Sequence, residues 1–175
     1  MKKPKAGYRY DLARGDMEAS WAASARANDL PVLGVCRGAQ MLNVFSGGTL
    51  DRDLSRYVEP VSANGLIEPL LLRKPISLDP KSLLASILGK TALPVNAIHK
   101  QAISRVGAGL RVVAREKNGI VQAVEDPSRR FWIGVQFHPE LMIYRRPFRQ
   151  LFKKLVEAAQ IRAQERHTES DSVAR

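Results

Sequence analysis

Apolar and polar positions along the chain change period several times, which predicts helices interleaved with strands. Residues 31–35 are continuously apolar, a pattern typical of a short strand whose two faces are both covered. A helix is predicted before this strand, over residues 16–28, and a second helix after it, ending at the glycine-rich residues 46–48. Met17 and Trp21 are one helical turn apart, so we expect both to lie on the buried face of the first helix.

The second half of the chain predicts a helix, a meander of strands and a final helix. Asp79 and Pro80 are expected to open a helix over residues 82–88 that stops at Gly89. Three β-rich runs, separated by Asn-Gly and Asp-Pro turns, follow at residues 110–114, 120–124 and 131–137. Strands interleaved with helices, together with one hairpin, predict a three-layer α/β domain.

The final helix is predicted to begin near residue 147. It carries one apolar stripe, formed by Phe148, Leu151, Phe152, Leu155, Val156 and Ala159. From about residue 162 the sequence is polar, and we expect it to fray. The predicted organisation is therefore one domain over residues 1–165, followed by a polar tail at residues 166–175.

Composition narrows the class of protein. The 175 residues are 45% hydrophobic, which suits one domain with its own core. No apolar run approaches the roughly 20 residues of a membrane span, and no secretion signal is evident. The single cysteine excludes an internal disulfide and suits a reducing compartment, so we expect a cytoplasmic protein. The net charge of +11 is spread along the chain, which favours a basic solvated surface over a nucleic-acid partner.

That cysteine, Cys36, lies in the sequence GVCRGA at residues 34–39, between the predicted strand and helix. This layout is typical of a nucleophile elbow, in which a helix N-terminus favours the reactive thiolate. Gly34 and Gly38 suit a strand and helix that cross without room for a Cβ, and the N–H of Arg37 is a predicted oxyanion donor. The alternative is a small buried hydrophobic residue, and the flanking glycines favour the elbow over it.

A nucleophilic thiol needs a base, and the chain has three histidines. His138 ends the last predicted strand, and Glu140 lies two residues further on, so the two side chains can address one site. His99 is better interpreted as lining the pocket, although its spacing leaves it open as the base. His167 lies in the polar tail. The scattered histidines show no zinc-ligand spacing, and no phosphate-binding loop is evident, so neither a metal nor a cofactor is expected.

Four sequence segments occur in an order that resembles a known group of proteins. They are GVCRGAQ at residues 34–40, GGTL at residues 47–50, His99 with the QAI of residues 101–103, and GVQFHPE at residues 134–140. Together they resemble the class I glutamine amidotransferase-like superfamily, and within it the gamma-glutamyl-gamma-aminobutyrate hydrolase family (peptidase family C26). The resemblance covers about residues 10–159. It implies a flavodoxin-like fold with a mostly parallel sheet.

The resemblance also implies an activity and a site. It implies a catalytic triad of Cys36, His138 and Glu140 that hydrolyses the amide bond of a small gamma-glutamyl substrate through a gamma-glutamyl thioester. It implies that Gln40 lies beside the gamma-glutamyl group. Further substrate-binding residues implied by the hydrolase branch are Arg37, His99 and Gln101.

The sequence departs from the family pattern at its start. Family members usually carry an N-terminal portion with the first strands of the sheet and a glycine-containing loop that gives a second oxyanion donor. Here about fifteen residues precede the first helix, so we expect those strands to be missing and a sheet edge to be exposed. Two alternatives stay open. One is a glutaminase subunit that delivers ammonia to a synthetase. The other, suggested by the short start, is a catalytically weak fragment that acts as an interaction module or is completed by a separate N-terminal segment. A homo-oligomer also stays open.

Overall fold

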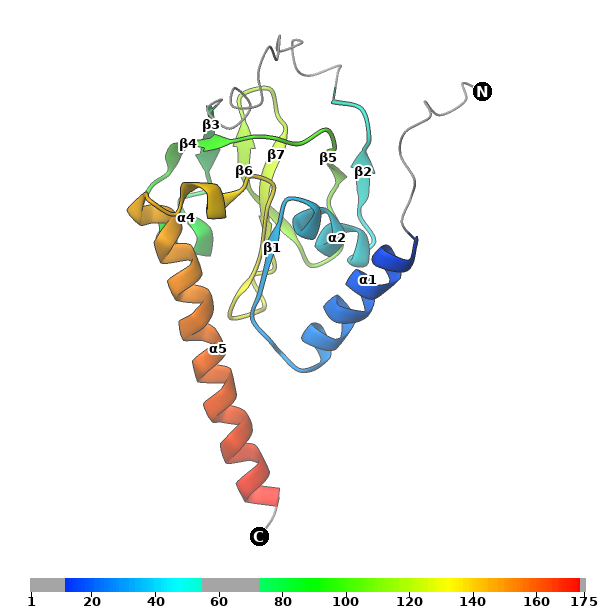
Figure 1. The fold of residues 1–175 in the computed structure, drawn as a ribbon, viewed down its shortest axis with the longest axis vertical. Coiled ribbons are helices and arrows are strands. Elements are labelled where there is room, and N and C mark those ends of the chain that lie inside the picture. The colour runs from blue at the N-terminus through cyan, green and yellow to red at the C-terminus, as the bar shows by residue number, and fades with distance from the viewer. Residues whose placement is uncertain (1–11, 55–72, 174–175) are drawn as a thin grey trace.

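The computed structural model describes residues 12–54 and 73–173 of the chain. The expectation of missing N-terminal strands falls in part on residues 1–11, which lie outside the described residues. In chain order the elements are α1 (Leu12–Ala27), β1 (Val32–Val35), α2 (Arg37–Phe45), β2 (Thr49–Asp51), β3 (Arg73–Leu78), α4 (Leu83–Leu88), β4 (Ala92–Asn96), β5 (Ala102–Arg105), β6 (Arg111–Glu116), β7 (Val121–Glu125), β8 (Trp132–Val135), the short 3-10 helix η2 (Pro139–Met142) and α5 (Arg146–Val173) (Figure 1).

The described strands form two sheets. Six strands run in the order β1-β8-β7-β6-β3-β4, and β2 pairs with β5 in a separate ribbon. β1 and β8 are parallel, whereas the other four neighbouring pairs of the main sheet are antiparallel. The predicted α/β class and the antiparallel meander are confirmed. The sheet is nevertheless mixed rather than mostly parallel over the described residues, and β1 forms one of its edges.

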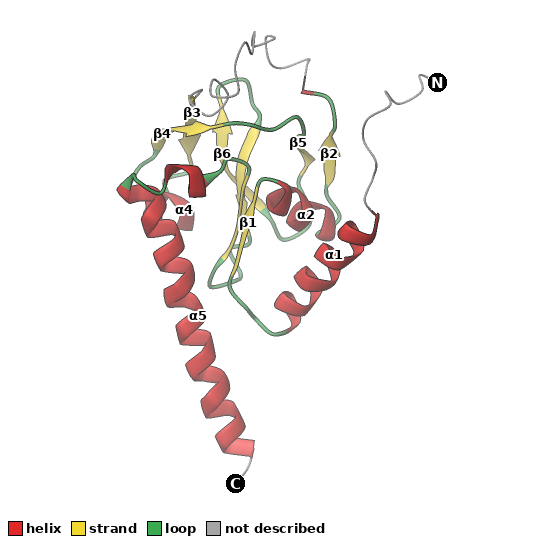
Figure 2. Cartoon of the chain, in the orientation of Figure 1, coloured by secondary structure: helices red, strands yellow, loops and turns green. Residues whose placement is uncertain are grey.

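Helices cover both faces of the main sheet, as Figures 1 and 2 show with α1 and α2 to one side and α5 to the other. Successive residues of β8 point to opposite faces. Trp132 packs with Ala22 of α1 and Leu42 of α2, whereas Ile133 belongs to the larger core cluster shared with α4 and α5. The predicted three layers are therefore confirmed, with one apolar core on each side of the sheet.

The first helix begins earlier than predicted and turns a different face to the core. α1 starts at Leu12, and Met17 and Trp21 are 45% and 68% exposed, so the prediction that they are buried is wrong. The helix instead packs through the small side chains of Ala22 and Ala25. The helix was correctly predicted, but the face that it turns to the core was not. The face with Ala22 and Ala25 packs inward because two alanines allow a closer approach to α2 than a large side chain would.

The caps of α4 also differ from the prediction in part. Ser82, and not Asp79, is the N-cap, because its Oγ accepts a hydrogen bond from the N–H of Ala85 at 3.0 Å. Asp79 instead closes a local turn by accepting from the N–H of Lys81 at 2.9 Å. Gly89 ends the helix at a φ of 64°, as predicted.

The last helix is longer and less buried than predicted. α5 continues to Val173, so the prediction of a frayed tail from about residue 162 is wrong for the described residues. Phe148 and Leu151 are fully buried, but Val156 is 55% exposed, and Ala158 is buried in place of Ala159. After Ala158, no residue of α5 with a described side chain is buried. None of the described helices, α5 included, is long and apolar enough to cross a membrane.

The crossing of β1 over α2 depends on one glycine rather than two. A Cβ on Gly34 would lie 2.7 Å from the backbone carbon of Gly38, closer than atoms can approach. A Cβ on Gly38 would meet nothing within 4 Å. The expectation that glycine is required because a Cβ would not fit is therefore confirmed for Gly34 and wrong for Gly38. Gly38 contributes only the backbone atoms that lie against Gly34.

We predict that Gly34→Ala and Gly38→Ala differ sharply in stability. Gly34→Ala forces α2 away from β1 and should lower the free energy of unfolding by about 1–3 kcal/mol or more, the range for overpacked sites. Gly38→Ala adds a methyl group to open space in the first turn of a helix and should change it by less than about 1 kcal/mol. Urea unfolding followed by circular dichroism measures both. Equal losses in the two variants would contradict this account of the crossing.

Candidate active site

Cys36 lies in the sharp turn between β1 and α2, as the elbow pattern predicts. Its φ of 50° and ψ of −101° are unusual for a residue other than glycine, a strain that is typical of functional turns. The N–H of Cys36 donates to the carbonyl of Val135 at 2.8 Å, which extends the β1–β8 pairing by one residue. Cys36 is partly buried at the carboxyl end of the two parallel strands.

His138 and Glu140 follow β8 at the same end of the sheet. The Nδ1 atom of His138 lies 2.6 Å from Oε1 of Glu140. A carboxylate only accepts, so it holds the proton on Nδ1 and leaves Nε2 as the basic nitrogen. The backbone N–H of His138 donates to Oδ1 of Asn96 at 3.1 Å. Asn96 is buried at the end of β4 and was not singled out from the sequence, although a polar residue that ends an apolar strand is a usable signal.

A side-chain amide within hydrogen-bond range of the Cys36 sulfur belongs to a residue to which the sequence analysis gave no role. Nε2 of Gln136 lies 3.6 Å from Sγ, within hydrogen-bond range for sulfur, whereas no hydrogen bond among the described residues joins Cys36 to His138. Burial raises the pKa of the Cys36 thiol; the N–H of Arg37 and the Gln136 amide lower it, and the Glu140 carboxylate raises it. The net pKa is raised, so the thiol is the resting form at neutral pH and a base is needed to form the thiolate.

The structure brings three of the four predicted substrate-binding residues together. The side-chain amide of Gln40 donates to the carbonyl of Gln101 at 3.0 Å, and Nδ1 of His99 lies 2.9 Å from the same oxygen. Arg37 lies apart from them, because its Nε is 2.9 Å from both carboxylate oxygens of Glu18 on α1.

His99 has both ring nitrogens occupied. The carbonyl of Gln101 only accepts, so the proton is on Nδ1, and Nε2 therefore accepts from the Gln122 amide at 2.9 Å. Burial lowers the pKa of His99; the Gln101 carbonyl and Glu116 raise it, and Lys74 and His138 lower it further. Both ring nitrogens of His99 are therefore occupied by hydrogen bonds, and the ring has no free lone pair to accept a proton.

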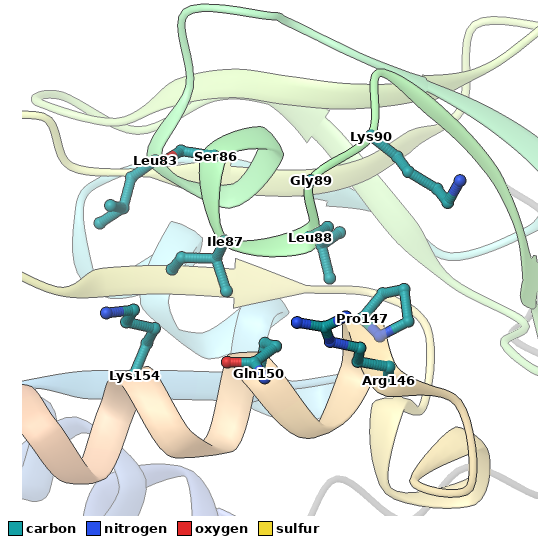
Figure 3. A pocket seen from close by; sticks show the side chains of 10 residues that line it. All are labelled: Leu83, Ser86, Ile87, Leu88, Gly89, Lys90, Arg146, Pro147, Gln150 and Lys154. Carbon is teal, nitrogen blue, oxygen red and sulfur yellow. The ribbon is translucent and has the colours of Figure 1, made fainter.

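A cavity of about 750 Å³ lies between α4 and α5 (Figure 3). Ile87 and Leu88 of α4 line it, together with Arg146, Gln150 and Lys154 of α5. It contains none of the predicted site residues. The described residues also contain no cluster of three or more histidine, cysteine or carboxylate side chains that could hold a metal ion.

Solved structures share this architecture. The chain matches the glutaminase domain of a Trypanosoma brucei CTPS with bound acivicin at a TM-score of 0.60 and 21% identity, over 87% of this chain and 69% of that one. A glutamine amido transferase from Methylobacillus flagellatus matches at a TM-score of 0.56 and 21% identity, over 71% of this chain and 44% of that one. The chain therefore shares its fold with a glutaminase domain and a glutamine amido transferase.

The family is defined by sequence. The model of the Peptidase C26 family matches residues 1–140, and the chain belongs to that family. It is 39% identical to the Mycobacterium tuberculosis protein named "Putative glutamine amidotransferase Rv2859c", over 74% of this chain and 41% of the relative. It is 32% identical to the gamma-glutamyl-gamma-aminobutyrate hydrolase PuuD of Escherichia coli, over 63% of this chain and 46% of the relative. The chain thus spans about half the length of the curated relatives it matches.

We predict that His99 makes the folded state sensitive to acid. The folded protein holds His99 neutral at pH values at which the unfolded chain binds a proton there, so stability is fully present above about pH 6.5 and falls as the pH decreases below it. His99→Asn keeps a donor near the Nδ1 position and removes the titration, so unfolding midpoints measured from pH 7.5 to 5 should fall less steeply in this variant.

The exposed His167 provides the matched control. His167→Asn should leave the pH dependence of the unfolding midpoint as it is in the unmodified protein. If His99→Asn and the unmodified protein had the same slope, His99 would not be held neutral by the fold.

Proposed function

We propose that the chain is a cysteine-nucleophile hydrolase of gamma-glutamyl amide bonds. The observation that carries the proposal is the 2.6 Å pair of His138 and Glu140 at the strand end beside the elbow cysteine Cys36. A base oriented by a carboxylate and a strained nucleophile at a helix N-terminus are the parts that acyl transfer through a thioester requires. Membership of a family that includes a gamma-glutamyl-gamma-aminobutyrate hydrolase supports the choice of substrate.

In the proposed reaction, Nε2 of His138 takes the proton of the Cys36 thiol while Glu140 stabilises the imidazolium. The sulfur attacks the gamma-carbonyl carbon, and the backbone N–H of Arg37 donates to the oxyanion. The C–N bond breaks, and the proton on His138 passes to the departing amine. His138 then activates a water molecule that hydrolyses the gamma-glutamyl thioester, which gives glutamate and the free thiol.

Substrate recognition is proposed for the residues implied by the family. Gln40, His99 and Gln101 lie in one hydrogen-bonded group close to Gln136, which contacts the nucleophile. Arg37 is held by Glu18 in the structure, so its guanidinium has to leave that carboxylate before it can bind a carboxylate of the substrate. The Arg37–Glu18 pair is partly exposed, and such pairs hold their partners weakly.

A glutaminase that delivers ammonia is the second candidate, favoured by the similarity to the M. tuberculosis protein named as a glutamine amidotransferase. The two functions differ in dependence on a partner. A free-standing hydrolase acts alone, whereas a glutaminase subunit turns over glutamine faster when its synthetase is present.

The position of β1 at an edge of the described sheet supports the proposal that a second copy or a complementing segment pairs there. Light scattering of the purified chain, measured alongside activity, tests this pairing.

We predict that hydrolysis of gamma-glutamyl-4-aminobutyrate by the purified chain depends on Cys36 and His138. Cys36→Ala should abolish turnover, and His138→Asn should lower kcat by about 10²–10⁴, the usual contribution of a general base. Glutamine and a chromogenic gamma-glutamyl anilide, assayed in parallel, identify the preferred leaving group. Release of 4-aminobutyrate is measured by chromatography.

His167→Asn is the matched control for His138→Asn, because it makes the same change on an exposed part of α5. It should retain full activity. Turnover that persists at the unmodified rate in Cys36→Ala would overturn the proposed function, and turnover of glutamine alone would favour the glutaminase.

A further inference from the structure

A continuous chain of hydrogen bonds leads from the sulfur of Cys36 into the interior of the domain. Gln136 Nε2 lies 3.6 Å from Sγ, and Gln136 Oε1 accepts from Nε2 of Gln40 at 3.1 Å. The same Gln40 nitrogen donates to the backbone carbonyl of Gln101 at 3.0 Å. Gln136 and Gln40 are 1% and 6% exposed, so water has little access to these bonds.

The direction of every bond in this inner part of the chain is fixed by the carbonyl of Gln101. A backbone carbonyl can only accept, so the Gln40 group that faces it must be its NH₂. The second hydrogen of that NH₂ then meets Gln136, which must present its oxygen. The NH₂ of Gln136 is thereby left on the side of Cys36, where it can donate to the sulfur.

A second series of hydrogen bonds, the arm from Glu116 through Gln122 to His99, ends at the same carbonyl. The direction of its bonds is set by Glu116. His99 donates to the Gln101 carbonyl through Nδ1 and accepts at Nε2 from Gln122, whose Nε2 also donates to Oε1 of Glu116 at 2.6 Å. Glu116 is buried and lies 3.4 Å from the ammonium group of Lys74. Because a carboxylate only accepts, Glu116 sets the orientation of Gln122 and therefore the tautomer of His99.

The orientation of Gln122 leaves one polar atom without a partner among the described residues. Its Oε1 is buried and accepts no hydrogen bond from any of them, an unfavourable state for a polar atom. Rotating the amide would place that oxygen against the Glu116 carboxylate and leave Nε2 of His99 without a donor. The lack of a partner for this oxygen within residues 12–54 and 73–173 is therefore a consequence of holding the arm in one direction.

We propose that Gln136 is a positioning residue that donates a hydrogen bond to the sulfur of Cys36, and that Gln40 acts on Cys36 only through Gln136. This inference rests on the proposed function, in which the Cys36 thiolate is the nucleophile. A neutral amide beside the sulfur stabilises the thiolate without adding a charge to a partly buried site. The arm from Glu116 to His99 holds the Gln101 carbonyl that gives the inner bonds their direction.

Because Cys36 is the only cysteine of the chain, alkylation by iodoacetamide reports its thiolate alone. The pH at which the alkylation rate is half-maximal should rise by about one unit in Gln136→Met, the size of a hydrogen bond to an ion. Gln136→Glu keeps an acceptor for Gln40 and places a negative charge near the sulfur, so the rise should be larger. The assay uses no gamma-glutamyl substrate, so its result is independent of whether hydrolysis is found.

Gln150→Met is the matched control, because Gln150 lines the cavity between α4 and α5 (Figure 3), and Cys36 is not among the residues that line it. It should leave the alkylation profile unchanged. Circular dichroism confirms that each variant is folded.

If Gln136→Met fails to fold, Gln40→Met tests the same bond, because it removes the donor that orients Gln136. The pH at which the alkylation rate is half-maximal should then rise by a smaller amount. An unchanged profile in a folded variant, Gln136→Met or Gln40→Met, overturns the proposal.

A double-mutant cycle tests whether Gln40 acts through Gln136. If it does, Gln40→Met should shift the profile when Gln136 is present and add nothing when it is combined with Gln136→Met. Additive shifts in the double variant would overturn the positioning role of Gln40. If each substitution only loosened the fold, the two shifts would add in the double variant. The cycle therefore separates a general loosening of the fold from an effect of Gln40 that passes through Gln136.

Discussion

The parallel pairing of β1 with β8 is the constraint on which the rest of the site depends. It is the one parallel contact of the main sheet among the described strands, and its register sets Val35 opposite Val135. Parallel strands end at the same edge, so the residues that follow them, Cys36 and Gln136, meet although they are 100 positions apart in the chain. A slip of one residue would turn the side chains of the slipped strand to the other face and so separate Cys36 from Gln136.

The same pairing holds Cys36 in a strained conformation. A residue other than glycine at a positive φ costs about 1–3 kcal/mol, and this is offset by the packing of α2 across β1 and β8. That packing is close at two points, because a Cβ on Gly34 would overlap the backbone of Gly38 and one on Gly134 would lie only 3.0 Å from the Cβ of Ala39. With Leu42 and Trp132 buried beside them, the helix has one position available, and the elbow is fixed by that position.

The elements that could be predicted from the sequence are those whose structure depends on residues close together in the chain. The strand, turn and helix around Cys36 and the hairpin at Gly119 depend on local backbone preferences and on a short apolar pattern. The face of α1 that is buried could not be predicted, because Trp21 satisfies the helical period as well as Ala22 and only the partner helix decides between them. The hydrogen bonds of Gln40 and Gln136 could not be predicted either, since they join residues that only the finished sheet brings together.

The arrangement divides two tasks that a thiol nucleophile requires. In the proposed reaction, removal of the proton falls to His138, whose partner carboxylate on Glu140 is 46% exposed and itself raises the pKa of Cys36. Stabilisation of the resulting thiolate falls to neutral groups, the N–H of Arg37 and the amide of Gln136, which lower that pKa. A charged donor in the buried position of Gln136 would itself require a counter-ion there. A neutral amide needs no counter-ion, but it can donate to the sulfur only if its NH₂ group is kept on the side of Cys36. The carbonyl of Gln101, which can only accept, orients the amide of Gln40, and Gln40 in turn orients Gln136.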